Sequence, residues 1–193
     1  MSEHSAAAAD LLERIGYLAR TGEQVAGLYP AQWAALRYLA RANRFSRTPM
    51  ALSRYLGSTR GTISQTLKAL ERKSYIRRKA SVRDRRAVEL ELSAEGVARL
   101  ESDPIAQLAA RIEQTLGDEA ARLGVMLRSV LADFVEQNGG RIFGECRTCR
   151  FFEKGKGENA GLPHRCGLLK ESLSNNDSLE ICAEHEASGF HRG

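Results

Sequence analysis

Residues 48–96 decide the fold, and they read TPMALSRYLGSTRGTISQTLKALERKSYIRRKASVRDRRAVELELSAEG. Thr48 is an N-cap residue followed by a proline, a pair that predicts a short helix beginning there and ending at Gly57. After one tight turn, Ser58 or Thr59 can cap a second helix. The apolar residues of this second helix share one face and are Ile63, Leu67 and Leu70.

A β-hairpin is predicted directly after the two helices. Residues 75–79 are followed by a charged tip at residues 81–87, and residues 88–92 then alternate strictly between apolar and acidic side chains. Two helices joined by a glycine turn and followed by a basic hairpin form an arrangement that reads duplex DNA. The second helix fits the major groove, about 12 Å wide, while the hairpin reaches the neighbouring minor groove or the backbone.

The second helix carries small polar residues that allow close approach to DNA, and longer side chains that reach base edges or phosphates. Arg54, on the preceding helix, is predicted to contact a phosphate. At the hairpin tip the arginines would enter a groove, and Asp84 would hold one guanidinium by charge-assisted hydrogen bonds. For any single arginine the alternative is simple solvation of the surface. The predicted DNA-binding residues are Arg54, Ser58, Thr59, Arg60, Thr62, Ser64, Gln65, Lys68, Arg83, Asp84, Arg85 and Arg86.

The distribution of charge supports this prediction. The chain has 193 residues, of which 42% are hydrophobic and 27% charged, values that are ordinary for a globular protein. Residues 41–86 contain fourteen Lys or Arg against two acidic residues, a net formal charge of +12, whereas the whole chain carries only +5. A basic middle flanked by acidic arms would steer a polyanion to one face of the molecule.

The remaining sequence predicts more helices and a separate C-terminal extension. Apolar periodicity indicates helices over residues 5–26, 30–42, 104–116 and 118–137, and another beginning at Ser93. The predicted fold class is therefore mainly α with a small β-hairpin wing, a winged helix-turn-helix, plus a short irregular cysteine-rich extension. Asn138-Gly139-Gly140 is a linker signal, so residues 1–138 form the expected DNA-binding and dimerisation domain and residues 139–193 the extension.

The chain shows neither a run of apolar residues long enough for a membrane helix nor a basic, apolar leader at its start. A cytoplasmic location without membrane contact is therefore expected. The motifs of residues 29–33, 58–64, 84–86 and 92–96, in this order, resemble the MarR family of winged-helix regulators over residues 5–137. The resemblance implies a homodimer whose first and last domain helices form the interface. Two winged heads would then meet a pseudo-palindromic double-stranded DNA.

All four cysteines lie in the last quarter of the chain, as Cys146-x2-Cys149-x16-Cys166-x15-Cys182. In a cytoplasmic protein such clustering favours metal ligation over disulfides, because cellular thiols keep ordinary cystines reduced. Structural zinc commonly uses two close pairs, and here only the first pair has that spacing. Iron-sulfur clusters accept one close pair with distant partners. We therefore expect an iron-sulfur cluster, of the 4Fe-4S type, with zinc as the alternative and a redox disulfide switch as a third possibility.

The cysteine spacing is also similar to that of the high-potential iron-sulfur proteins, although the extension lacks their aromatic run near the last cysteine. His164 and His185 are reserve metal ligands. We expect an apolar shell that limits water at the cluster, and three arginines that offset the negative charge of four thiolates. The shell residues are Phe143, Phe151, Phe152, Leu168, Leu169, Leu173 and Ile181, and the arginines are Arg147, Arg150 and Arg165.

Three functions follow from these predictions. The first is a dimeric transcription regulator modulated by the cluster or by its redox state. The second keeps the DNA reader but has a structural zinc site and a small-molecule effector bound between the dimer helices and the winged domain. The third, from another class, is a redox or electron-transfer protein. Because no catalytic triad, glycine-rich phosphate loop or paired acid motif occurs in the sequence, we expect that the protein is not an enzyme.

Overall fold

Helix α2 (Pro30–Arg41) lies at the centre of the hydrophobic core of the chain. The computed structural model describes residues 2–25, 27–80 and 88–188. Pro30 occupies the first turn of α2, where its missing N–H costs no hydrogen bond. Trp33 is fully buried. It shares this core with the apolar residues Leu36, Leu39, Leu52, Ile63, Leu67 and Leu70.

Two short helices and a hairpin follow α2, in the predicted order. Helices α3 (Pro49–Leu56) and α4 (Arg60–Arg72) pack on α2, and strand β1 (Ile76–Ala80) pairs antiparallel with β2 (Val88–Leu92). Ile76 lies opposite Leu92 in this register. The expected winged helix-turn-helix is thus confirmed. The tip of the hairpin, residues 81–87, is outside the described residues.

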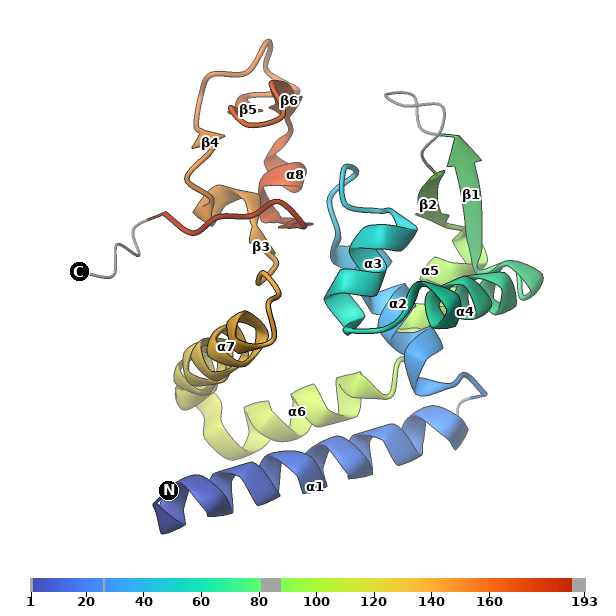
Figure 1. Ribbon diagram of the computed structural model, residues 1–193, viewed down its shortest axis with the longest axis vertical. Helices are drawn as coiled ribbons and strands as arrows, with labels where there is room; N and C mark the ends of the chain where they lie inside the picture. Colours follow the sequence, from blue (N-terminus) through green and yellow to red (C-terminus); the bar gives the residue numbers. More distant parts are fainter. Residues whose placement is uncertain (1, 26, 81–87, 189–193) are drawn as a thin grey trace.

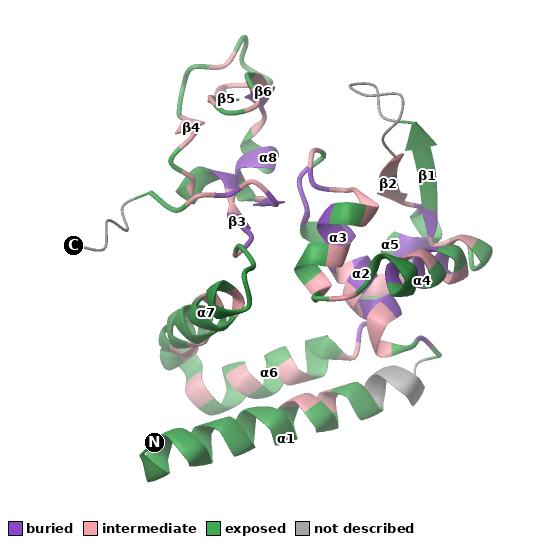
Figure 2. Cartoon of the chain, in the orientation of Figure 1, coloured by how far each residue is buried: buried purple, intermediate pink, exposed green. Residues whose placement is uncertain are grey.

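The remaining helices form the end of the molecule opposite the hairpin. Helix α1 (Glu3–Val25) and helix α6 (Ile105–Leu116) lie at the base of Figure 1, and α5 (Ala94–Glu101) joins the winged module to α6. Near Gly117 a short 3-10 helix, η1 (Gly117–Glu119), separates α6 from α7 (Ala120–Gln137), at the predicted break. Figure 2 shows that α1, α6 and α7 are mostly exposed along their lengths. None of the described residues in these three helices is buried.

The C-terminal extension contains short regular elements where an irregular segment was expected. It is built from β3 (Gly144–Glu145), η2 (Cys146–Thr148), β4 (Phe152–Glu153), β5 (His164–Cys166), β6 (Glu171–Leu173), α8 (Asn175–Leu179) and β7 (Ile181–Cys182). Strand β3 pairs with β7, and β4, β5 and β6 form a three-stranded antiparallel sheet. These strands are two or three residues long, too short to show an alternating pattern in the sequence.

Within the described part of the chain, no helix is both long and apolar enough to cross a membrane.

Candidate nucleic-acid interface and cysteine pocket

The turn between α3 and α4 is fixed by side-chain caps. The Thr48 hydroxyl accepts a hydrogen bond from the Ala51 N–H at 3.1 Å, and the Thr59 hydroxyl accepts one from the Thr62 N–H at 3.2 Å. Between the helices, Gly57 has φ 59°, a left-handed conformation that glycine adopts without steric cost. The capping signals read from the sequence therefore position both helices of the helix-turn-helix.

Helix α4 separates a buried apolar side from an exposed polar side. Ile63, Leu67 and Leu70 point into the core. On the other side of α4, in the turn before it and on α3, six of the predicted DNA contacts are exposed, and the remaining two, Ser58 and Ser64, are half-buried. The six exposed residues are Arg54, Thr59, Arg60, Thr62, Gln65 and Lys68. The structure thus brings every described member of the predicted set to the surface around α3 and α4.

The hairpin beside α4 presents basic side chains as well. Arg77, Arg78 and Lys79 on β1 are exposed. Arg78 pairs with Glu71 of α4 at 2.9 Å, which joins the hairpin to this helix. The predicted tip contacts Arg83, Asp84, Arg85 and Arg86 lie outside the described residues.

Arg54 contacts the C-terminal extension in this structure. Its guanidinium donates to the Ala183 carbonyl at 3.1 Å and pairs with Glu184 at 3.3 Å, and it lies over the Phe143 ring. A phosphate contact by Arg54 therefore competes with this ion pair. The role of Arg54 in DNA binding stays a prediction.

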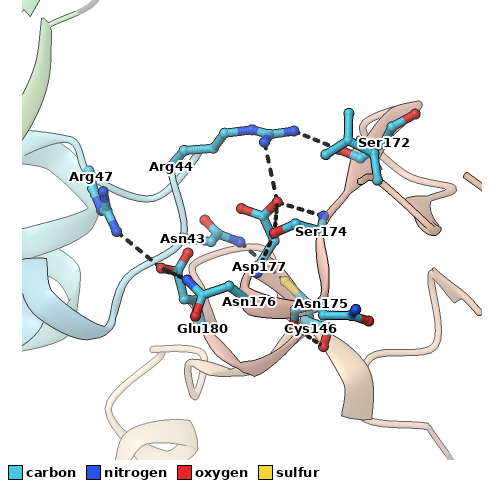
Figure 3. Close-up of polar contacts among 12 residues, drawn as sticks. Asn43, Arg44, Arg47, Cys146, Ser172, Ser174, Asn175, Asn176, Asp177 and Glu180 are labelled. Carbon is cyan, nitrogen blue, oxygen red and sulfur yellow. Dashed lines mark hydrogen bonds and ion pairs between the residues drawn. The ribbon is translucent and has the colours of Figure 1, made fainter. Parts of the chain in front are cut away.

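The loop between α2 and α3, residues 43–47, is bound to the extension by further contacts, which Figure 3 shows. Arg44 pairs with Asp177 at 3.2 Å and donates to the Ser172 carbonyl at 2.6 Å. Arg47 pairs with Glu180 at 3.2 Å. Acidic residues of the extension thus neutralise part of the basic middle of the chain. The sequence predicted both groups of charges but not their contact.

All four cysteines line one pocket. The space inside it is about 20 Å³, room for little more than one water molecule, and its other lining residues are Phe151, Phe152, Leu168, Leu169, Leu173 and Glu184. Five of the seven predicted shell residues therefore lie at the pocket. The other two, Phe143 and Ile181, pack in the winged-helix core instead, and Phe143 contacts the rings of Tyr38 and Tyr55.

Each cysteine sulfur accepts a hydrogen bond from an N–H group. Three donors are backbone groups of the extension: Leu169 to Cys166 at 3.5 Å, Glu184 to Cys182 at 3.4 Å and Glu186 to Cys149 at 3.5 Å. The fourth donor is the Asn43 side-chain amide, which reaches Cys146 at 3.2 Å from the α2–α3 loop. Figure 3 shows Asn43 and Cys146 where the loop and the extension meet.

Cys146 and Cys182 are the two buried cysteines, and they interact. The hydrogen bond between their thiols lowers the pKa of Cys182 to about 6, against an opposing effect of burial. The same hydrogen bond and burial raise the pKa of Cys146. Of the two thiols, Cys182 is therefore the one that loses its proton more readily.

The two reserve histidines do not line the pocket. His164 Nε2 is 3.0 Å from the Asn175 side-chain oxygen, and the His164 ring packs on Phe152. His185 Nε2 is 2.9 Å from the Thr148 hydroxyl, and burial lowers the pKa of His185. Within residues 2–25, 27–80 and 88–188, no group of three or more His, Cys, Asp or Glu side chains is arranged to hold a single metal ion.

The three arginines expected to offset thiolate charge are paired with carboxylates. Arg147 pairs with Glu145 at 2.6 Å, Arg150 with Glu186 at 2.7 Å and Arg165 with Glu153 at 4.0 Å. Glu145 and Glu186 adjoin Cys146 and His185 in the sequence. The arginines therefore hold the strands and turns that carry the cysteines, and polarity at the sulfurs comes from the N–H donors instead.

Comparison with known proteins shows which fold the chain shares. Residues 26–87 match the model of the MarR family, whereas no curated protein matches the chain. Among solved structures, MarR from E. coli in its apo form is 22% identical, with 68% of this chain and 98% of that chain covered and a TM-score of 0.52.

Two further structures are similar to a comparable degree. A MarR transcriptional regulator from Methanosarcina mazei is 21% identical, with coverage of 70% of this chain and 99% of that chain and a TM-score of 0.54. MepR from S. aureus, solved as a complex with DNA, is 24% identical over 65% of this chain and 96% of that chain, with a TM-score of 0.50. The chain therefore has the winged-helix fold of MarR proteins, and its residues 26–87 match that family.

Proposed function

We propose that the protein is a transcription regulator that binds a pseudo-palindromic double-stranded DNA as a homodimer. The observation that carries this proposal is the surface of α4, where polar and basic side chains gather opposite a fully buried apolar side. A helix with this division fits the major groove while its other face stays in the core. The DNA complex of S. aureus MepR, which has a similar fold, supports the proposal.

The match of residues 26–87 to a family of regulators favours a regulator over an enzyme or an electron-transfer protein. The homodimer is supported by the exposed apolar residues of α1, α6 and α7, which a second copy would cover. A dimer places its two heads about 34 to 36 Å apart, one helical turn of DNA.

The cysteine pocket is the proposed regulatory site. The extension contacts the α2–α3 loop and Arg54 through ion pairs and hydrogen bonds. A change of metal content or redox state at the cysteines would therefore act next to the helix-turn-helix. The alternative is a structural zinc at the cysteines, with a small molecule as the effector. In that case, binding of the metal to the cysteine pocket leaves the affinity for DNA unchanged.

The DNA proposal is tested with two variants on α4 after an operator has been selected from random duplexes. If Gln65 reads a base, Gln65→Ala weakens binding to the selected operator by about 1 to 3 kcal/mol and leaves non-specific binding alone. If Lys68 contacts a phosphate, Lys68→Ala weakens binding to all duplexes alike and reduces the salt slope by about one unit.

Arg128→Ala is the matched control, because Arg128 is an exposed arginine on α7, a helix that lies away from the wing. It should leave both operator affinity and salt slope unchanged. The measurement is fluorescence anisotropy over a salt series. A wild-type protein that prefers no duplex over heparin in dilute buffer would overturn the proposed function.

A further inference from the structure

We infer that the cysteine pocket binds a 4Fe-4S cluster and that Asn43 transmits the state of this cluster to the helix-turn-helix. The inference has two parts. The assignment of the cluster stands on the pocket alone, whereas the transmission rests on the proposed DNA-binding function. Both parts start from the same contact, the hydrogen bond from the Asn43 amide to the Cys146 sulfur.

The spacing of the cysteines favours a cluster over a single structural ion, because only one close pair occurs, where structural zinc commonly uses two. Zinc needs its four sulfur ligands about 2.3 Å from one point, and no three metal-binding side chains of the described residues converge in that way. In a cubane cluster each cysteine binds a different iron at its own corner, so the sulfur atoms stand farther apart. All four cysteines line one pocket, but the space inside it is only about 20 Å³ and the Cys146 and Cys182 thiols are hydrogen-bonded to each other, so these sulfurs must move apart to admit a cluster.

The chemistry of the pocket walls suits a cluster as well. Aromatic and aliphatic side chains line the pocket beside the sulfurs and limit the access of water. Every sulfur already accepts an N–H hydrogen bond. Such bonds stabilise the negative charge of thiolates bound to iron and set the reduction potential of a cluster. Because the fold provides all four donors, the site is organised for thiolate ligands.

Binding of an assembled cluster balances without an oxidant or reductant. The cluster arrives with four terminal thiolates of a donor: four bonds from iron to the donor thiolates break as four bonds from iron to the cysteines form, and the four cysteine S–H protons go to the departing thiolates. The oxidation state of the cluster does not change in this step. The protein supplies the thiolates, their N–H donors and the apolar walls.

Asn43 connects the pocket with the DNA-reading elements. Its backbone N–H donates to the Ile181 carbonyl at 2.9 Å, beside Cys182 in β7, and its side-chain oxygen accepts from the Ser46 N–H at 2.9 Å. The Ser46 hydroxyl in turn accepts from the Ala183 N–H at 2.8 Å. Asn43 and Ser46 are both buried, so these contacts are shielded from water.

The same loop carries the start of α3 and one strand of the wing. Thr48, the N-cap of α3, follows the loop directly, and the Arg47 carbonyl accepts from the Leu90 N–H of β2 at 2.7 Å. A shift of Cys146 on cluster binding would thus move Asn43, the loop, α3 and β2 together. Loop 43–47 is the mechanical connection between the pocket and the DNA-binding surface.

The cluster is tested on the full-length protein purified without air. We expect about four iron and four sulfide atoms per chain and a visible absorption band that bleaches in air. Cys149→Ser should lose iron and sulfide while circular dichroism shows retained helices. Zinc without sulfide, a content of two iron and two sulfide atoms, or full loading of the Cys149→Ser protein would each overturn the assignment.

The role of Asn43 is tested with Asn43→Asp, which keeps the oxygen that accepts from Ser46 and loses the N–H donor to Cys146. We expect the midpoint potential of the cluster to fall and its removal by a chelator to become about tenfold faster. Asn138→Ala is the control, since Asn138 is an exposed residue at the end of α7 whose amide bonds to the Phe134 carbonyl. An unchanged potential in Asn43→Asp would exclude Asn43 as a positioning residue for the cluster.

Transmission is tested by comparing operator affinity of the loaded and cluster-free wild-type protein. We expect a difference of about tenfold, within the usual range of allosteric coupling, and a much smaller difference in Asn43→Asp. Equal affinities of the two wild-type forms would overturn transmission while leaving the cluster assigned. Failure of both forms to bind any duplex would instead overturn the proposed function, and the iron and sulfide content would still decide the cluster.

Discussion

Asp103 is the residue that joins the winged module to the helices of the expected dimer interface. Its two carboxylate oxygens accept from Arg37 of α2 at 2.7 and 2.6 Å, and one of them also accepts from the Ile105 N–H at the start of α6. Asp103 is only 8% exposed. Burial would raise the pKa of this carboxyl, but the hydrogen bonds from Arg37 and Ile105 outweigh it and hold the pKa below its usual value.

We therefore expect Asp103→Asn to lower the free energy of unfolding by about 2 kcal/mol at pH 7, since hydrogen bonds to a charged group are lost. A carboxyl with a lowered pKa in the folded state stabilises the protein above its unfolded pKa, about 3.9. That contribution is lost as the pH falls further, through the folded pKa. Urea unfolding at a series of pH values measures this. A difference between wild type and variant that persists unchanged at pH 3 would contradict the account.

At the scale of elements, Gly96 sets how closely α5 approaches the start of the wing. A Cβ at Gly96 would overlap the backbone carbonyl of Tyr75, between α4 and β1. The same carbonyl accepts a hydrogen bond from the Ser93 N–H, at the N-cap of α5. The path of the chain out of the hairpin therefore needs a residue without a side chain at this position.

We expect Gly96→Ala to destabilise the protein by about 1 to 3 kcal/mol, because the backbone must move to admit the methyl group. Gly124→Ala is the matched control, since a Cβ there meets nothing within 4 Å in the middle of α7. That control should gain about 0.5 to 1 kcal/mol from the better helix propensity of alanine. Chemical denaturation of both variants distinguishes the two effects, and equal stabilities would show that the overlap is relieved at no cost.

Local signals in the sequence predicted the elements of the winged module. Caps at Thr48 and Thr59, a glycine turn and strict alternation in residues 88–92 act over a few neighbouring residues, so they can be read without the fold. The Asn43–Cys146 contact joins residues 103 positions apart. No local pattern marks it, and Asn43 was missed for that reason.

The cysteine site, too, was predictable from the sequence only in part. Clustering of four thiols within 37 residues of an otherwise cysteine-free chain favoured a common site for them, and all four do line one pocket. Whether Phe143 and Ile181 lie at the cysteine pocket or in the winged-helix core depends on how the extension packs against α2 and α3. Such packing between distant segments is a tertiary property, and composition does not reveal it.

At the scale of the whole molecule, a stripe of apolar residues on α7 faces solvent in the single chain. Met126, Val130 and Phe134 follow one another at four-residue steps and are 52%, 60% and 68% exposed. Leu12 and Leu18 of α1 are likewise exposed. Because stripes of this kind are costly to leave in water, a second copy of the chain is the occupant that the proposed dimer requires.

We therefore expect Val130→Asp to weaken dimerisation by about 30-fold or more, the effect of losing an interface hot spot and placing a charge there. Operator binding should fall with it, because a single head neutralises only half of the phosphates. Arg128→Asp, on the same helix at an exposed and already charged position outside this four-residue series, should leave the dimer intact. Sedimentation equilibrium over a range of protein concentrations measures both variants, and a Val130→Asp protein that stays dimeric at nanomolar concentration would place the interface elsewhere.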